Sequence, residues 1–91
     1  MTDVIIEHAP SEARLAELDV KNWPTWSKEV STFSWFFDEV EVAYVLEGEV
    51  VITPDNGTPV SFGAGDLVTF PEGLSCTWEV RKPLHKHYQL G

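Results

Sequence analysis

A single carboxylate stands on a strand face that is otherwise apolar. In the run from Glu41 to Leu46, alternation puts Glu41 on the same face as Ala43 and Val45, because every second side chain of a strand points the same way. Such a carboxylate lies either at the mouth of a fold or inside a polar pocket. There it would bind a cationic or hydrogen-bonding substrate, or act as a general base. The alternative is a structural carboxylate held by backbone amides or by a tyrosine hydroxyl.

Cys76 is the only cysteine of the chain, which excludes an internal disulfide and a multi-cysteine zinc site. The run from Cys76 to Val80 places the thiol on the apolar face, beside Trp78. A buried free cysteine behaves as a small hydrophobic residue, and a nucleophilic one needs an electropositive neighbour that lowers the thiol pKa. We therefore expect an inert thiol. The alternative is a nucleophile that acts with His87 and Glu41.

His85 and His87 stand two residues apart, so a strand would carry both on one face. Such a pair can bind a metal ion. The stretch from Arg81 to His87 is, however, the basic part of an acidic chain, and a solvated or interfacial strand is the simpler interpretation. Asp38 and Glu39 are interpreted as part of a loop, with a cation site as the alternative.

Three aromatic residues, Trp35, Phe37 and Trp78, are predicted to stand on inner strand faces. Aromatic side chains supply much of the burial that a small domain achieves, so these rings are expected to fill the core. The alternative is that they form the walls of a slot for a flat or cationic ligand. With Glu41 and Cys76, they make up the candidate ligand-binding residues, and no catalytic residue is assigned.

The elements that position these residues are short and rich in β-branched and aromatic residues, which predicts an all-β sandwich or barrel. The expected strand runs are Val4–Ile6, Phe33–Phe37, Val42–Leu46, Val50–Thr53, Val60–Phe62, Leu67–Phe70 and Cys76–Val80. Asn56-Gly57 predicts a tight hairpin turn with positive φ. Only Ser11 to Leu18 is expected to be helical, with Ser11 as its N-cap.

The composition limits the class of protein. Ninety-one residues allow one domain, and 15 acidic against 6 basic side chains give a formal charge of −9. This charge argues against a nucleic acid or an anionic membrane as partner, because both require a basic face. No signal peptide or membrane-spanning run is recognised. The expected protein is soluble and cytoplasmic.

Two motifs, in this order, resemble those of the cupin family. Glu41, followed by Tyr44-Val45-Leu46-Glu47-Gly48, is similar to the second half of the first cupin motif. Gly65, Pro71 and Gly73 are similar to the first half of the second motif. The resemblance implies a small cupin jelly-roll barrel that encloses a ligand cavity.

The resemblance covers most of the chain, from about residue 23 to residue 88, and implies a single cupin domain over 1–91 with its core at about 23–90. More closely, the chain is similar to the small single-domain cupins grouped with ureidoglycine aminohydrolase and the ethanolamine-utilisation cupins. The stretches that carry this similarity are Trp23-Pro24-Thr25-Trp26, Gly65–Pro71, Gly73–Trp78 and Lys86-His87-Tyr88.

The cupin metal site departs from the family pattern. Its His-x-His pair falls on Trp35 and Phe37 or on Ser34 and Phe36, and its second-motif histidine falls on Cys76. Glu41 alone is retained, with Cys76 as the alternative second ligand, whereas a catalytic zinc site needs about three protein ligands. We therefore expect no metal and no cofactor.

Three functions remain open. The first is a metal-independent cupin that binds a small polar metabolite in the barrel. The second is an enzyme similar to ureidoglycine aminohydrolase, acting on a ureide C–N bond, and the third is a filled barrel with a structural or interaction role. A homodimer is expected, with the Val4–Ile6 strand crossing between subunits. If Glu41 carries an uncompensated charge for a ligand, Glu41→Gln is expected to stabilise the fold.

Overall fold

The computed structural model describes residues 4–91, most of which lie in antiparallel strands. One short helix and one 3-10 turn interrupt the strands near the N-terminus. The elements in chain order are β1 (Ile5–His8), α1 (Glu12–Leu18), the 3-10 turn Val20–Asn22, β2 (Thr25–Lys28), β3 (Ser31–Phe36), β4 (Glu41–Pro54), β5 (Val60–Gly63), β6 (Asp66–Phe70) and β7 (Ser75–Leu90).

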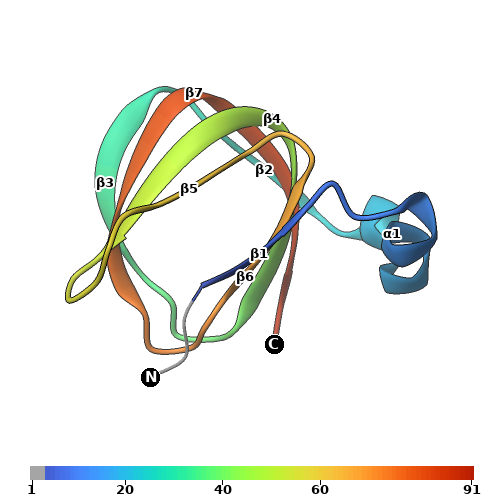
Figure 1. Cartoon of the computed structure of the whole chain (residues 1–91), viewed down its shortest axis with the longest axis horizontal. Helices are drawn as coiled ribbons and strands as arrows, with labels where there is room; N and C mark the ends of the chain where they lie inside the picture. The colour runs from blue at the N-terminus through green and yellow to red at the C-terminus, as the bar shows by residue number, and fades with distance from the viewer. Residues whose placement is uncertain (1–3) are drawn as a thin grey trace.

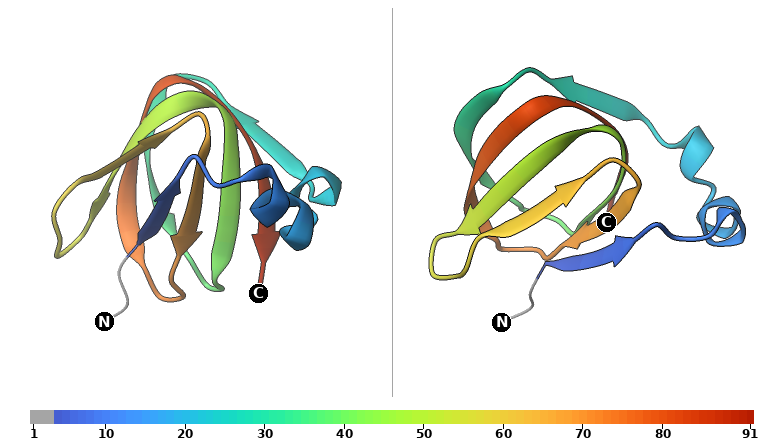
Figure 2. Two further views of the ribbon diagram at one scale, coloured as in Figure 1. Left: turned by 45° about the vertical axis from the view of Figure 1, so that its right-hand side comes forward. Right: turned by 45° about the horizontal axis from the view of Figure 1, so that its top comes forward.

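The strands form one curled sheet, which wraps into a small barrel (Figures 1 and 2). The order across the sheet is β1-β6-β4-β7-β2, with β3 paired to β7 and β5 paired to β4. The two longest strands, β4 and β7, pair along nearly their whole length, from Glu41 opposite Leu90 to Pro54 opposite Cys76. The predicted all-β fold with one N-terminal helix is therefore confirmed.

The helix α1 lies outside the barrel, at the side of the molecule (Figure 1). Ser11 caps it as predicted, because the Ser11 hydroxyl accepts a hydrogen bond from the amide of Arg14 at 3.1 Å. Asp19 ends the helix in the left-handed conformation, with φ 59°. None of the helices formed by residues 4–91 has the length and apolar content that a bilayer crossing requires.

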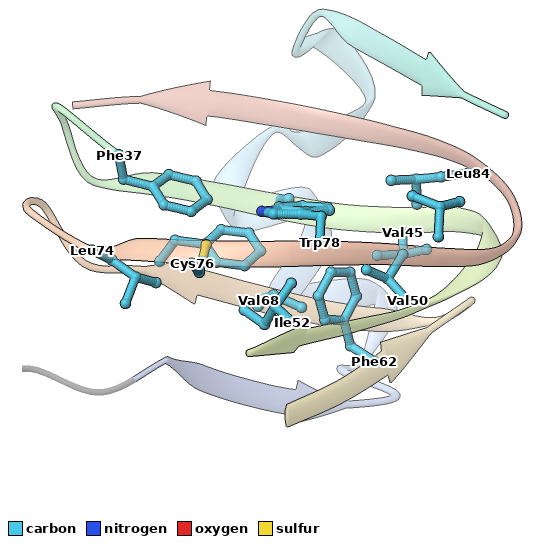
Figure 3. Close-up of a cluster of buried hydrophobic side chains, with 13 residues drawn as sticks. Phe37, Val45, Val50, Ile52, Phe62, Val68, Leu74, Cys76, Trp78 and Leu84 are labelled. Atoms are coloured by element: carbon cyan, nitrogen blue, oxygen red, sulfur yellow. The ribbon is translucent and has the colours of Figure 1, made fainter. Parts of the chain in front are cut away.

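The interior is filled by side chains that alternate along the long strands (Figure 3). On β4, Ala43, Val45, Val50 and Ile52 have no exposed surface, and on β7 Trp78 is 2% exposed. The other buried members of this core cluster are Phe37, Phe62, Val68, Phe70, Leu74, Cys76, Val80 and Leu84. The strand faces predicted for Glu41–Leu46 and Cys76–Val80 are those that the structure shows.

Gly48 allows β4 to cross closely over β7. Its φ is 115°, and a Cβ atom there would lie 2.7 Å from the carbonyl oxygen of Pro83. Only glycine combines this backbone conformation with such an approach. The pairing of β4 with β7 is irregular here, between Val45 and Val50, and regular alternation resumes on either side.

One local expectation, for the turn between β4 and β5, differs from the structure. The hairpin between β4 and β5 forms, but its loop spans residues 55–59 and neither Asn56 nor Gly57 has a positive φ. This loop is longer than the tight turn expected at Asp55-Asn56-Gly57, so positive φ angles at Asn56 and Gly57 are not needed. The expected strand Val4–Ile6 is seen as β1 (Ile5–His8), which pairs with β6 within the chain, with Ile5 opposite Thr69. Its crossing between subunits stays a prediction.

Candidate functional site

A buried ion pair joins the two longest strands inside the barrel. Glu41 is the first residue of β4, and Lys86 lies near the end of β7. The Lys86 ammonium donates a hydrogen bond to the Glu41 carboxylate, and the two side chains are only 6% and 9% exposed. The backbone of Lys86 faces Val45, so its four-carbon chain runs along the barrel wall to reach Glu41. A buried pair of this kind needs each partner to compensate the other's charge.

Four aromatic rings surround the Lys86 ammonium. The Nζ atom lies 5.2 Å from the ring centre of Trp78 and 5.3 Å from that of Trp26. The rings of Phe70 and Tyr88 are each at 5.8 Å. These distances lie within the range of cation–π attraction. Burial lowers the pKa of Lys86 below its ordinary value, while the charge and the hydrogen bond of Glu41 oppose this shift.

A cavity of about 250 Å³ opens beside the ion pair. Its walls are mainly aromatic, and Glu41 and Lys86 supply the buried charges. The aromatic residues of the walls include Trp26, Phe33, Trp35, Phe37, Trp78 and Tyr88. Asp38 and Glu39 also line the cavity, and both are exposed to solvent. An apolar cavity with a few converging polar groups is the usual form of a small-molecule site.

Trp78 contributes a buried polar group that has no well-aligned partner. Its Nε1 atom is buried and makes no well-aligned hydrogen bond within residues 4–91, although the Trp78 side chain lies close enough to the Cys76 thiol to interact with it. The ring contacts Phe37, Phe62 and Phe70, with ring centres 5.6 to 6.3 Å apart. In Figure 3 the indole nitrogen lies on the edge of the ring that is turned toward Phe37, a residue of the cavity wall. Unpartnered buried donors are rare in folded proteins.

The structure distributes the predicted site residues over three positions. Glu41, Phe37 and Trp78 are buried and line the cavity, at 7%, 3% and 2% exposure. Trp35 also lines the cavity but is 51% exposed, so it stands at the rim rather than fully on an inner face. The reason is its place near the end of β3, which pairs with β7 alone and leaves the outer side of Trp35 open.

Cys76 is a core residue outside the cavity lining. It is 2% exposed, and its thiol donates a weak hydrogen bond to the Trp35 carbonyl oxygen, with 3.6 Å between sulfur and oxygen. Burial raises the pKa of the Cys76 thiol, a hydrogen bond with the Trp78 side chain opposes this rise, and the nearby Asp55 adds to it. A raised thiol pKa keeps the sulfur protonated at neutral pH, which is the state of an inert cysteine.

The two histidines of β7 lie away from Cys76 and Glu41 in the pairing of the strands. The Nδ1 atom of His87 donates to the Trp23 carbonyl oxygen at 3.0 Å, which ties β7 to the segment before β2. Within residues 4–91, no three histidine, cysteine, aspartate or glutamate side chains come together as a metal site would require.

Lys86 is the residue that sequence reasoning missed. The alternation of buried residues in Cys76–Val80 resumes beyond Pro83, with Leu84 and Lys86 both buried. Extending the pattern across the proline would have found Lys86. Lys86 compensates the charge of Glu41, so the condition under which Glu41→Gln is expected to stabilise the fold is not met. Glu41→Gln would instead leave a buried ammonium without its counter-ion.

Comparisons with known proteins identify the family and the fold. A family model described as the EutQ-like cupin domain matches residues 15–88. The structure of a DUF861 family protein from Thermotoga maritima superposes with a TM-score of 0.95 at 48% identity, covering 98% of this chain and 100% of that one. A search of curated proteins finds no match.

More distant similarity extends to two longer proteins. The EutQ protein of Clostridium difficile is 27% identical over 72% of this chain, with a TM-score of 0.66, and this chain spans 52% of it. A putative ethanolamine utilization protein Q from Salmonella typhimurium is 24% identical over 72% of this chain, with a TM-score of 0.65. This chain spans 53% of that protein, so the likeness concerns the fold of one domain.

Proposed function

Because the chain belongs to the EutQ-like cupin family, we propose that its barrel binds a small polar metabolite in the cavity beside Glu41 and Lys86. The observation that carries the proposal is this cavity, in which aromatic walls surround a buried ion pair. A barrel with a purely structural role would gain stability by filling the space with apolar side chains. The retained cavity and charges favour a binding role.

The proposed site includes four of the residues expected from the sequence, namely Glu41, Trp35, Phe37 and Trp78, together with Lys86. Each of them lines the cavity. Cys76 lies outside this lining and is not assigned a binding role. Trp35 and the exposed carboxylates of Asp38 and Glu39 stand where a ligand would enter.

The proposed binding does not require a metal ion. The positions at which the cupin motifs carry histidine fall on Trp35 and Phe37, or on Ser34 and Phe36, and on Cys76, none of which is a histidine. Glu41 is engaged by Lys86. A transition metal would have to displace Lys86 and find its further ligands elsewhere. Elemental analysis of protein made without a chelating tag should show well below one metal ion per chain. Near one zinc, iron, manganese or nickel per chain would refute metal independence.

Ligand-induced stabilisation tests the binding proposal. The probes are small polar compounds with up to about ten non-hydrogen atoms, grouped as amides, amines, alcohols and carboxylates. A ligand that binds only the folded protein at 100 times its Kd adds about 2.7 kcal/mol of stability. We expect at least one group to raise the Tm of the wild-type protein.

Two variants locate the binding. Trp35→Ala removes an exposed ring at the rim and should reduce the Tm shift that a probe produces. Ile5→Ala is the matched control, because Ile5 is 59% exposed and does not line the cavity. It should leave the shift unchanged. No shift with any group of probes, or one that Trp35→Ala does not reduce, would contradict the proposal.

A further inference from the structure

Lys86 places a primary amine at the wall of the cavity. Its Nζ atom lies 5.2 to 5.8 Å from the ring centres of Trp26, Trp78 and Tyr88, all three of which line this space. The Lys86 side chain lines the cavity as well and is 6% exposed. A well-packed apolar pair can stabilise a protein as much as a buried ion pair does, or more. The amine therefore points to chemistry at the cavity rather than to stability alone.

The Glu41 carboxylate is the acid–base partner of this amine. Lys86 Nζ donates a hydrogen bond to Glu41, which is the only hydrogen-bond partner of the ammonium among residues 4–91. A proton that passes along this bond leaves a neutral amine beside a carboxylic acid. Burial disfavours the charged form of an amine and lowers the pKa of Lys86, although Glu41 opposes this shift. A lysine that is desolvated in an apolar pocket is activated for Schiff-base formation.

The charge of Glu41 limits the kind of reaction that suits Lys86. An acyl group on Nζ would make a neutral amide and leave the Glu41 carboxylate buried without its counter-ion. An aldehyde or ketone instead converts the amine to a protonated imine, which keeps one positive charge beside the carboxylate. A carbonyl group is therefore the electrophile that preserves the charge balance of the site.

The rim and the size of the cavity limit the rest of the compound. The exposed carboxylates of Asp38 and Glu39 line the cavity of a chain with a net charge of −9, which disfavours an anion. The ion pair is already neutral as a whole, so a charged substituent beside it would be buried without a partner. The volume of about 250 Å³ is the share of about eight water molecules in the liquid. A small, uncharged compound with an apolar body fits these limits.

We propose that Lys86 forms a reversible Schiff base with small, uncharged aldehydes or ketones that enter the cavity. Glu41 carries protons between the lysine nitrogen and the carbonyl oxygen, and the apolar body of the compound packs against the aromatic walls. This inference rests on the proposed binding function and adds the chemical class of the ligand and a covalent step.

The covalent step begins when the Lys86 ammonium gives one proton to the Glu41 carboxylate. The nitrogen lone pair then attacks the carbonyl carbon, so that a C–N bond forms and the electron pair of the C=O π bond passes to oxygen. Glu41 hands two protons in turn from nitrogen to oxygen, the C–O bond breaks, and water leaves. A protonated imine remains beside the Glu41 carboxylate, with no net change in charge or oxidation state.

Reductive trapping tests the proposal on the wild-type protein. Butanal is the probe, dimethylamine–borane is the uncharged reductant, and a butyl group marks each lysine that forms an imine at neutral pH. Peptide mass spectrometry measures the rate of labelling at each lysine. Lys86 should be labelled faster than Lys28 by about tenfold or more, because an exposed lysine is almost fully protonated and one pKa unit changes the neutral fraction about tenfold.

Lys28 is the matched control within the same chain. Its Nζ atom lies 5.4 Å from the ring centre of Phe33 and 3.9 Å from a carboxylate oxygen of Glu29. Its side chain is, however, 34% exposed and does not line the cavity. Unfolding the chain in urea should remove the difference in labelling rate between Lys86 and Lys28, since that difference comes from the folded site.

A charged analogue tests the class of the compound. 4-Oxobutanoate has the chain length of butanal, with a carboxylate in place of the terminal methyl group. Relative to Lys28, it should label Lys86 much more slowly than butanal does. Equal relative rates for the two compounds would overturn the assignment to uncharged carbonyl compounds.

The remaining outcome separates this inference from the proposal on which it rests. Labelling of Lys86 by butanal that is no faster than labelling of Lys28 in the folded protein would overturn the Schiff base. The binding function would still stand on its own test, because the compounds used in the Tm measurements include no aldehyde or ketone.

Discussion

The two ends of the long strand pair β4–β7 face interiors of different character. In the packed region, Val50, Ile52 and Val80 lie among other apolar side chains, and each of the three is at most 1% exposed. In the hollow region, around Glu41 and Lys86, the same strands carry a buried ion pair beside a cavity. Trp78 touches both regions, since it contacts Phe62 on the packed side and lines the cavity.

We infer that the packed region serves the stability of the fold and that the hollow region serves binding. The packed region uses close packing of hydrocarbon, which is the efficient way to stabilise a small domain. The hollow region keeps charges and empty space, neither of which is the most stable choice for the sequence. The predictions below test whether the two regions can be disturbed independently.

The largest expected effect is the loss of one partner of the ion pair. Glu41→Gln leaves the Lys86 ammonium buried without its counter-ion and should lower the free energy of unfolding by about 3–5 kcal/mol. The double variant Glu41→Gln/Lys86→Met should recover most of this loss, since it removes both charges. Urea denaturation of the two variants measures both effects. Stabilisation by Glu41→Gln alone would show that Lys86 does not compensate Glu41 in solution.

A second prediction compares one residue from each region. Ile52→Ala opens a cavity in the packed region and should reduce stability by about 2–5 kcal/mol. It should leave the affinity of a cavity probe unchanged. Trp35→Ala, at the exposed rim of the hollow region, should change the free energy of unfolding by no more than about 0.5 kcal/mol. It should, however, weaken the binding of the probe. Equal effects of both variants on binding would show that the two regions are not independent.

We expect a smaller effect of pH on stability, which arises from the ionisation of Lys86 in the hollow region. Burial lowers the pKa of Lys86 from its ordinary 10.5, so over a range of pH the unfolded chain holds a proton that the folded chain has lost. The free energy of unfolding should therefore rise with pH between the lowered pKa and 10.5, relative to the Glu41→Gln/Lys86→Met variant, and stay level below that range. A relative stability that falls with pH over this range would contradict the lowered pKa.

Assembly should have the smallest effect on either region. We propose that the chain forms a homodimer, because β1 and β2 end the path of the sheet and edge strands favour pairing with a second copy. Sedimentation should give a mass near twice the 10.3 kDa of one chain, with unchanged probe affinity on dilution. A mass of one chain at micromolar concentration would refute the dimer.

Much of the fold could be predicted from the sequence because strand alternation is a local signal. The buried faces of Glu41–Leu46 and Cys76–Val80 and the cap at Ser11 follow from neighbouring residues alone. The partner of Glu41 could not be found in this way, because Lys86 lies 45 residues further along the chain. Pro83 and the neighbouring basic residues made that segment resemble a solvated strand.

The exposure of Trp35 depends on tertiary structure as well. Alternation places it on the same face as Phe33, but it does not show that β3 pairs on one side only. The cavity is likewise a property of the closed barrel rather than of any one strand. Its walls combine residues of β2, β3, β4 and β7, which only the folded chain brings together.

The most direct test of the account is a crystal structure of the protein soaked with a small polar compound that raises its Tm. The account predicts the compound inside the barrel, in the cavity between Trp35 and Phe37, with Glu41 still paired to Lys86. A barrel in which Trp35 and Phe37 close the space, with Glu41 or Lys86 turned to solvent and no compound inside, would contradict it.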